Sequence, residues 1–343
     1  MQNLILPRSA GAGSSFQTPL IAYRPNSPGE HGFLPVSDGD RLFWEESGHP
    51  QGIPALHLHG GPGGTLGNSG YRHRWDLART RLIGFEQRGC GRSTPSAADL
   101  NIPADQFTTQ KLIEDIEALR IDRGIDKWIL NGVSWGSTLA LAYAQAHPSR
   151  VLGLVLFAVT TTSREEVQWI TETVGAFFPE AWDRLSKFAR THIPGYESGR
   201  MSLVEAYAQM HSSPVSDLRD AASIEWALWE DTHISLGSER VLRDPRWKEK
   251  QFRHAVTRLT THFWSHSGFC QPPILDQVEL INHLPAIFIH GRNDVSSPAA
   301  TAWKLHRSWP GSELQICEGD AHGGASMVKH WTAANLKMLD LAS

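Results

Sequence analysis

The stretch Gly132-Val133-Ser134-Trp135-Gly136 constrains the fold of this chain more than any other feature. The apolar strand run WILN comes just before it, and the helix-favouring run STLALAYAQA directly follows it. A serine flanked by glycines at a strand-to-helix junction is typical of a nucleophile elbow, a turn in which glycine leaves room for closely packed backbone. The alternative, a serine in an ordinary turn, is disfavoured by the strand and the helix on either side. The pattern therefore predicts that Ser134 lies at the carboxyl edge of a parallel sheet.

Strands and helices alternate on both sides of this turn. The apolar runs RLFWEES, PALHLHG, RLIGFEQRG and VLGLVLFAV each indicate a strand, and residues 108–125 have apolar positions at helical spacing. Continuous apolar runs are typical of parallel strands that are buried on both faces. This alternation predicts a doubly wound α/β sheet.

The hydrophobic pattern changes between residues 160 and 275. Strand-like runs are absent there, and amphipathic stretches such as SREEVQWITETVGAFF take their place. We therefore expect an α/β core made of residues 31–159 and 276–343, with residues 160–275 inserted as a helical cap. Residues 1–30 are rich in Gly, Ser and Pro and are expected to form a flexible N-terminal extension.

Charge and cysteine content exclude several classes of partner. The net charge is only −4 and no block of basic residues is present, so neither a nucleic acid nor a membrane surface is an expected partner. No apolar run reaches the roughly 18 to 20 residues that span a bilayer. The three cysteines are odd in number and lack CxxC spacing, which argues against disulfides and zinc and fits a cytoplasmic protein. We expect a small-molecule or peptide substrate, and the sequence does not determine the oligomeric state.

A serine nucleophile needs a base, and the base needs a third group that fixes its tautomer. Asp294 follows the apolar run AIFIH, and His322 follows LQICEG, so both come just after late strands and in the usual order of serine, acid, histidine. Alternatively, Asp294 caps a turn and His322 is an exposed loop histidine. Asp320 is the rival acid, but it precedes His322 by only two residues and is better explained as a turn residue.

The developing oxyanion needs backbone N–H donors that are already in place. The run HGGPGG directly follows the strand ALHL, and its glycines allow the backbone to approach a substrate closely. We expect one donor from this loop and a second from the N–H of Trp135. The run could instead be a simple glycine-rich connection, and it is not a phosphate loop because GxxxxGK[ST] is absent.

Two pairs of histidines have spacings that could suit a metal ion. His57 and His59 alternate along a strand, and His262 and His266 share a helix face. Neither pair has an HExxH motif or a nearby carboxylate to complete a ligand set. We therefore expect no metal and no cofactor.

Four motifs in order resemble those of the proline iminopeptidase (prolyl aminopeptidase) family. They are HGGPGG, FEQRGCGRSTP, GVSWGSTLALAYAQAHP and HGRNDVSSPAATAWKLHRSWP, and the resemblance extends over residues 32–343. It implies an α/β-hydrolase fold with the catalytic residues Ser134, Asp294 and His322. The oxyanion donors that it implies are Gly61, Gly60 and Trp135. It also implies that the inserted helices form a cap over the active site.

In that family, cap carboxylates hold the free amine of an N-terminal proline. The stretch Trp226-Ala227-Leu228-Trp229-Glu230 keeps one of them, so the resemblance assigns Glu230 and Trp229 to substrate binding. Thr260 stands where the family has a second glutamate, and Glu86 stands where it usually has aspartate, so both positions are also expected to belong to the substrate-binding site. Losing one buried, charge-assisted contact of about 1.5 to 3 kcal/mol would weaken amine binding by about ten-fold or more.

The leading hypothesis is a serine hydrolase that acts by acyl transfer and releases N-terminal proline. Thr260 and Glu86 favour a second hypothesis, an esterase or amidase on a specialised metabolite with the same catalytic residues. A binding protein that has lost catalysis is disfavoured by the intact serine, histidine and acid. A cofactor-independent oxidative role is the most distant alternative.

Overall fold

The structure is a computed structural model that describes residues 29–67, 70–194, 196 and 200–343. The predicted N-terminal extension lies outside the described residues up to position 28. Glu30 already begins the first strand, so the folded part starts one residue before the predicted boundary.

The described part of the chain contains one eight-stranded sheet in the order β1-β2-β4-β3-β5-β6-β7-β8. The pairs β1–β2 and β2–β4 are antiparallel, and every pair from β4 to β8 is parallel. The predicted α/β class with a mostly parallel sheet is confirmed. The strands are β1 (Glu30–Pro35), β2 (Arg41–Gly48), β3 (Ile53–Leu58), β4 (Thr80–Phe85), β5 (Trp128–Val133), β6 (Val151–Phe157), β7 (Ala286–Gly291) and β8 (Glu313–Cys317).

Helices cover both faces of the sheet, which explains why the central strands are apolar along their whole length. On one face, α1, α2 and α8 surround a core that includes Ile116, Leu139 and Leu305. On the other face, α9 packs against β6, β7 and β8 through residues such as Met327 and Trp331. These helices are α1 (Thr109–Asp122), α2 (Trp135–Ala146), α8 (Ala299–Arg307) and α9 (Ala325–Leu341).

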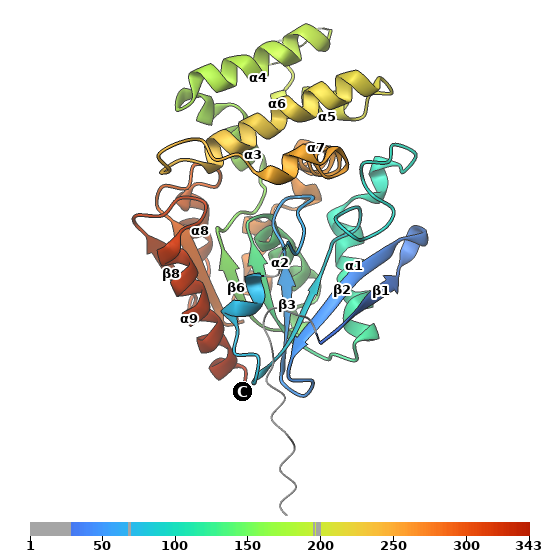
Figure 1. The fold of residues 1–343 in the computed structure, drawn as a ribbon. Helices are drawn as coiled ribbons and strands as arrows, with labels where there is room; N and C mark the ends of the chain where they lie inside the picture. Colours follow the sequence, from blue (N-terminus) through green and yellow to red (C-terminus); the bar gives the residue numbers. More distant parts are fainter. Residues whose placement is uncertain (1–28, 68–69, 195, 197–199) are drawn as a thin grey trace, which may run out of the picture.

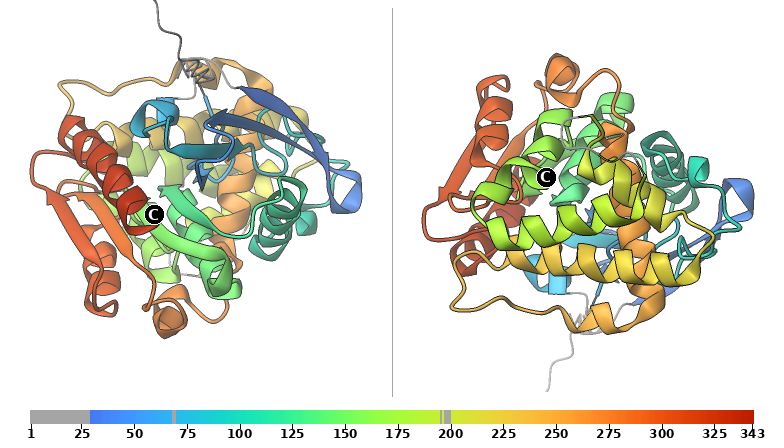
Figure 2. Two further views of the ribbon diagram at one scale, coloured as in Figure 1. Left: turned by 90° about the horizontal axis from the view of Figure 1, so that it is seen from below. Right: turned by 90° about the horizontal axis from the view of Figure 1, so that it is seen from above.

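The five remaining α-helices of the described chain lie together above the carboxyl ends of the strands (Figure 1). Seen from above, they extend across this end of the sheet (Figure 2). They have a hydrophobic core of their own, in which Leu185, Tyr207 and Trp226 are fully buried. The helices are α3 (Arg164–Thr171), α4 (Pro179–His192), α5 (Leu203–His211), α6 (Ser216–Ile234) and α7 (Lys250–Ser265).

One predicted helix is shorter than its sequence pattern suggested. The helical stretch expected over residues 163–178 ends at Thr171 and is followed by a 3-10 turn, Thr173–Ala176. Trp182 explains the break, because its indole N–H donates to the carbonyl of Thr171 at 2.8 Å. The ring of Trp182 also packs directly against Gly175. Tertiary packing therefore overrides the local helical period here.

No helix in the described ranges is long and apolar enough to cross a membrane.

Candidate active site

Ser134 occupies the sharp turn between β5 and α2, with φ 54° and ψ −122°. This left-handed conformation is costly for a residue with a side chain and is held by a hydrogen bond from its N–H to the carbonyl of Phe157, 2.8 Å long. The flanking glycines are required sterically. A Cβ at Gly132 would overlap the carbonyl oxygen of Gly136, and a Cβ at Gly136 would overlap that of Leu58. The turn therefore projects the serine hydroxyl beyond the sheet edge.

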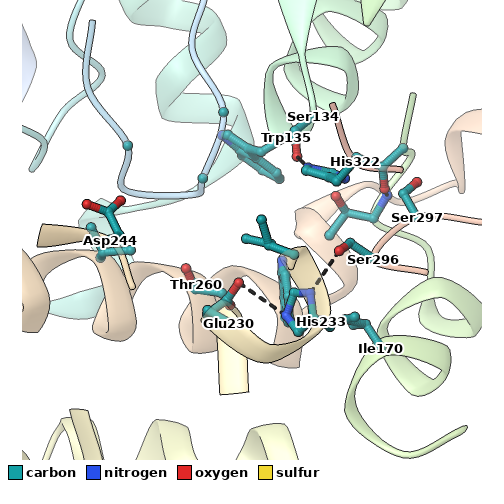
Figure 3. Close-up of a pocket in the computed structure, with 18 of the residues that line it drawn as sticks. Ser134, Trp135, Ile170, Glu230, His233, Asp244, Thr260, Ser296, Ser297 and His322 are labelled. Carbon is teal, nitrogen blue, oxygen red and sulfur yellow. Dashed lines mark hydrogen bonds and ion pairs between the residues drawn. The ribbon is translucent and has the colours of Figure 1, made fainter. Parts of the chain in front are cut away.

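The loops after β7 and β8 bring Asp294 and His322 to this hydroxyl. His322 Nε2 lies 3.0 Å from Ser134 Oγ, and His322 Nδ1 lies 2.9 Å from Asp294 Oδ2. Figure 3 shows the imidazole of His322 next to Ser134. The other oxygen of Asp294 accepts the backbone N–H groups of Ser296 and Ser297 at 2.9 and 3.0 Å. The acid is thus held from both sides, and it orients the imidazole toward the serine.

The two charged partners shift each other's pKa in opposite directions. Burial by itself would raise the pKa of Asp294. The neighbouring His322 lowers this pKa by a larger amount, so the net pKa lies below the ordinary value. For His322, burial by itself would lower the pKa. The Asp294 carboxylate and, more weakly, the charge of Glu230 raise it, and the net pKa lies above the ordinary value. The imidazolium form is therefore stabilised where proton transfer would create it.

A second histidine, His290, lies next to the acid, with its Nε2 3.6 Å from Asp294 Oδ2. The N–H of Val159 donates to His290 Nδ1 at 3.0 Å, so the proton of the neutral ring is on Nε2 and donates to the carbonyl of Ser297 at 2.7 Å. Burial lowers the pKa of His290, which keeps the ring neutral. His290 thus anchors the loop that carries Asp294.

The rival acid, Asp320, has a different partner. Its Oδ2 accepts the N–H of Met327 at 2.6 Å, in the first turn of α9. Its own carbonyl accepts the N–H of Asn293 at 3.0 Å. Asp320 therefore braces the turn before α9, while Asp294 is the acid that contacts His322.

The glycine loop after β3 lies directly over the serine. A Cβ on Gly60 would lie 3.3 Å from Ser134 Cβ, and Gly61 has φ +137°, which glycine adopts far more readily than other residues. Gly60, Gly61 and Trp135 all line the same cavity as Ser134. Trp135 is the first residue of α2, where helical N–H groups have no partner inside the helix. The three predicted oxyanion donors are thus gathered at one point.

His59 holds this loop in place. The N–H of Gln87 donates to His59 Nε2 at 3.1 Å, so the ring proton is on Nδ1 and donates to the carbonyl of Gly60 at 2.9 Å. Gln87 in turn accepts the indole N–H of Trp135 at 2.9 Å. Burial lowers the pKa of His59, so the ring stays neutral. His59 is a brace for the glycine loop.

The other histidines of the two predicted pairs also have protein partners. His57 Nδ1 contacts the Asn131 side chain at 3.0 Å, and His262 Nε2 contacts the carbonyl of Phe107 at 3.0 Å. Among the described residues, no group of three or more His, Cys, Asp or Glu side chains is arranged to hold a metal ion.

A cavity of about 320 Å³ lies between the sheet edge and the inserted helices (Figure 3). This size is in the range of small-molecule sites. It contains Ser134 and His322 from the core and Glu230 and Thr260 from the insertion. Sequence reasoning missed several of its lining residues, among them Glu166, Ile170, His233, Asp244, Arg246, Phe252 and Ser296.

Glu230 has its carboxylate at the cavity wall, with a side chain that is 14 % exposed. The indole N–H of Trp226 donates to its Oε1 at 3.0 Å. His233 Nε2 lies 3.3 Å from its Oε2. The carboxylate keeps unoccupied lone pairs and is therefore free to accept a cationic ligand group.

Of the other three predicted substrate-binding residues, only one lines the cavity. Thr260 lines the cavity, but its hydroxyl donates to the carbonyl of Pro62 at 3.0 Å and so ties α7 to the glycine loop. Trp229 is completely buried in the core of the inserted helices and is not among the cavity-lining residues. Glu86 does not line the cavity either, because its carboxylate accepts from the side chain of Arg92 at 2.9 and 3.1 Å and braces that loop. Direct contact with a substrate is therefore not supported for Trp229 and Glu86.

Comparison with known families agrees with this fold. Residues 56–325 match the model of the alpha/beta hydrolase fold family. Solved structures with this architecture include an esterase from Exiguobacterium antarcticum (TM-score 0.57, 18 % identity, 91 % of this chain and 100 % of that chain) and VinJ (TM-score 0.61, 20 % identity, 92 % and 99 %). The protein is an α/β hydrolase of the serine type.

Sequence relatives give the family within this class. A proline iminopeptidase of Arabidopsis thaliana is 38 % identical over 313 residues, which cover 90 % of this chain and 79 % of that protein. A proline iminopeptidase of Xylella fastidiosa (strain Temecula1) is 38 % identical over 303 residues, covering 88 % and 93 %. A probable proline iminopeptidase of Streptomyces coelicolor is 36 % identical over 308 residues, covering 88 % and 93 %. The chain belongs to the proline iminopeptidase family.

Proposed function

We propose that this chain is a serine aminopeptidase that releases proline from the N-terminus of peptides, with Ser134, His322 and Asp294 as its catalytic residues. One observation carries the proposal: a single cavity holds Ser134 Oγ at 3.0 Å from His322 Nε2 together with the carboxylate of Glu230. Acyl transfer needs an activated serine, and selection of a free N-terminus needs an anion near it. The curated relatives named proline iminopeptidase support the same activity.

In the acylation step, Ser134 Oγ attacks the carbonyl carbon of the N-terminal residue and its proton passes to His322 Nε2. Asp294 keeps the other ring proton on Nδ1, 2.9 Å away, so Nε2 is free to accept. The carbonyl oxygen becomes an oxyanion and accepts the N–H groups of Trp135 and Gly61, with Gly60 beside them. His322 then returns the proton to the leaving nitrogen, and the C–N bond breaks to give an acyl-enzyme.

Deacylation repeats these steps with water. His322 takes a proton from a water molecule whose oxygen attacks the ester carbon of the acyl-enzyme. Collapse of the second tetrahedral intermediate breaks the bond to Ser134 Oγ, which recovers its proton from His322. The released acid is the free N-terminal amino acid.

Glu230 is the residue that we assign to the substrate's ammonium group. Three carboxylates line the cavity in the described chain, and the oxygens of the other two already accept several hydrogen bonds or an ion pair. Glu166 accepts hydrogen bonds from the N–H and hydroxyl of Thr161 at its Oε2, and Asp244 is paired with Arg246. Glu230 has no arginine or lysine partner in the described residues. An uncompensated carboxylate in a narrow cavity favours a cation over a neutral group.

A second candidate function is ester or amide hydrolysis of a small metabolite. Thr260 favours it, because a threonine whose hydroxyl is already bonded to Pro62 adds no negative charge to the cavity. With a single free carboxylate, selection for an ammonium group would be weaker than with two. The chemistry at Ser134 would be the same for both candidates.

Relative kcat/KM values for three substrates test the proposal. We expect proline β-naphthylamide to be cleaved far faster than its N-acetylated form or a short-chain p-nitrophenyl ester. The variant Glu230→Gln should raise KM for the free-amine substrate by about ten-fold or more and leave ester hydrolysis almost unchanged. Ester hydrolysis without prolyl activity would instead support the second candidate.

The proposal also covers the domain organisation of the chain. We assign residues 31–159 and 276–343 to the hydrolase core and residues 160–275 to a cap that roofs the cavity. The cap and the core meet where Arg258 of α7 donates to the carbonyls of Ala97, Asp99 and Ile102. We also propose that the protein acts in the cytoplasm on small peptides, and its three cysteines, all free, support a reducing compartment.

A further inference from the structure

His233 is a buried cavity residue to which the catalytic steps above give no role. It lies in the last turn of α6 and lines the cavity, and its side chain is only 2 % exposed. It contacts one residue of the inserted helices and one residue of the α/β core, as the dashed lines in Figure 3 show. One contact is to Glu230, three residues earlier on the same helix, and the other crosses to Ser296 in the loop that carries Asp294.

The partners of its two ring nitrogens determine where the proton lies. His233 Nε2 is 3.3 Å from Glu230 Oε2, and a carboxylate oxygen can only accept. The proton therefore belongs on Nε2. In the neutral ring, Nδ1 then accepts the hydroxyl proton of Ser296, 2.8 Å away. The Glu230 carboxylate thus selects the tautomer, and the Ser296 hydroxyl is compatible with it because a hydroxyl can donate to Nδ1.

The His233 ring nitrogen Nε2 has no partner in the described residues that meets hydrogen-bond geometry, and Glu230 Oε2 is the carboxylate oxygen within ion-pair distance of it. Movement of the carboxylate away from the ring would leave this buried donor farther still from an acceptor, which is unfavourable. On the other side, the Trp226 indole N–H donates to the other carboxylate oxygen at 3.0 Å. The Glu230 carboxylate therefore lies between the Trp226 indole and the His233 ring.

We infer that His233 is a positioning residue that holds the Glu230 carboxylate in the orientation that receives a substrate ammonium group. It also links this amine site to the core, because the backbone N–H of Ser296 donates to Asp294 while its hydroxyl serves His233. The inference rests on the proposed function, since it takes Glu230 as the amine-binding residue. It predicts that His233 contributes to binding of cationic ligands only, and only through Glu230.

Equilibrium binding to the Ser134→Ala protein tests this without any turnover. The probe is prolinamide, and the control ligand is cyclopentanecarboxamide, which has a similar shape but no amine. Calorimetry would measure both dissociation constants in the Ser134→Ala background, alone and combined with His233→Ala, His233→Gln or Glu230→Gln. Glutamine at 233 retains an N–H donor that reaches Glu230, so it serves as the conservative variant.

We expect His233→Ala to weaken prolinamide binding about ten-fold and His233→Gln by less than about two-fold. Cyclopentanecarboxamide should bind all variants with nearly equal affinity. Adding His233→Ala to Glu230→Gln should produce no further loss, because a residue that acts through Glu230 has nothing left to orient.

Three results would overturn the inference: equal weakening of both ligands by His233→Ala, a further ten-fold loss in the Glu230→Gln background, or no measurable binding of prolinamide. Failure of the proposed function would look different. In that case the wild-type enzyme would not cleave proline β-naphthylamide, whatever the dissociation constants of the Ser134→Ala variants.

Discussion

Replacement of Asp294 by asparagine tests the arrangement of the site most directly. The side-chain oxygen of asparagine can still accept from the N–H groups of Ser296 and Ser297, so the loop should keep its shape. The new amide NH₂ would then face His322 Nδ1, where Asp294 Oδ2 now lies at 2.9 Å. An amide donor there forces Nδ1 to accept. The ring proton moves to Nε2, which can no longer take a proton from Ser134.

The expected loss in kcat is about 10³- to 10⁴-fold, equivalent to roughly 4 to 5.5 kcal/mol of transition-state stabilisation. The pH profile should change as well. His322 must be neutral to act as a base, so activity falls below its pKa. Asp294 contributes to raising that pKa, and without the carboxylate the opposing effect of burial increases in relative weight. The acidic limb of kcat/KM should therefore move to lower pH.

Steady-state kinetics with proline β-naphthylamide would measure both effects, and a thermal melt would check that the variant is folded. Asp320→Asn is the matched control, because its side-chain oxygen can still accept the N–H of Met327. It should leave kcat within a few-fold of wild type. If Asp294→Asn kept more than about a tenth of the activity, or if Asp320→Asn were the more damaging change, the assignment of the acid would be refuted.

Three further predictions concern other parts of the molecule. Ser134→Ala should abolish turnover and leave the melting temperature nearly unchanged; residual activity above a few per cent would argue against Ser134 as the nucleophile. Arg258→Met should lower the free energy of unfolding in urea by about 2 to 4 kcal/mol, because three loop carbonyls lose their donor, whereas the half-exposed Arg246→Met should cost less than about 1 kcal/mol. Equal midpoints for the two variants would contradict this role. Cys90 should react with Ellman's reagent only after denaturation, because burial raises the pKa of its thiol; rapid labelling of the native protein at this position would disagree with the structure.

The catalytic residues that the α/β core contributes could be predicted from the sequence because each of them follows a strand. Ser134, Asp294 and His322 each come just after an apolar run, and the carboxyl ends of parallel strands meet at one edge of the sheet. The glycine loop after β3 follows the same rule. The confirmed α/β class, with its parallel strands, was enough to bring these residues together.

The cavity residues that the inserted helices contribute could not be predicted in this way. His233, Asp244 and Trp247 come from the end of α6 and from the 3-10 turn Pro245–Lys248 and its cap, where no periodic pattern marks a cavity wall. Helical spacing indicates which face of a helix is buried but not what it is buried against. Trp229 illustrates the difference, because it shares a motif with Glu230 yet is enclosed in the core of the inserted helices.

The sequence by itself determined which catalytic groups follow which strands: the elbow at Ser134, the glycine loop and the later acid and histidine. The elbow depends on a local backbone rule, since only glycine at positions 132 and 136 leaves room for the tight strand-to-helix turn. Only the tertiary structure decided which carboxylates face the substrate. Glu86 and Asp244 are neutralised by arginines, while Glu230 is left uncompensated beside His233. The charge of a cavity depends on side chains from distant segments, and their pairing exists only once the chain has folded.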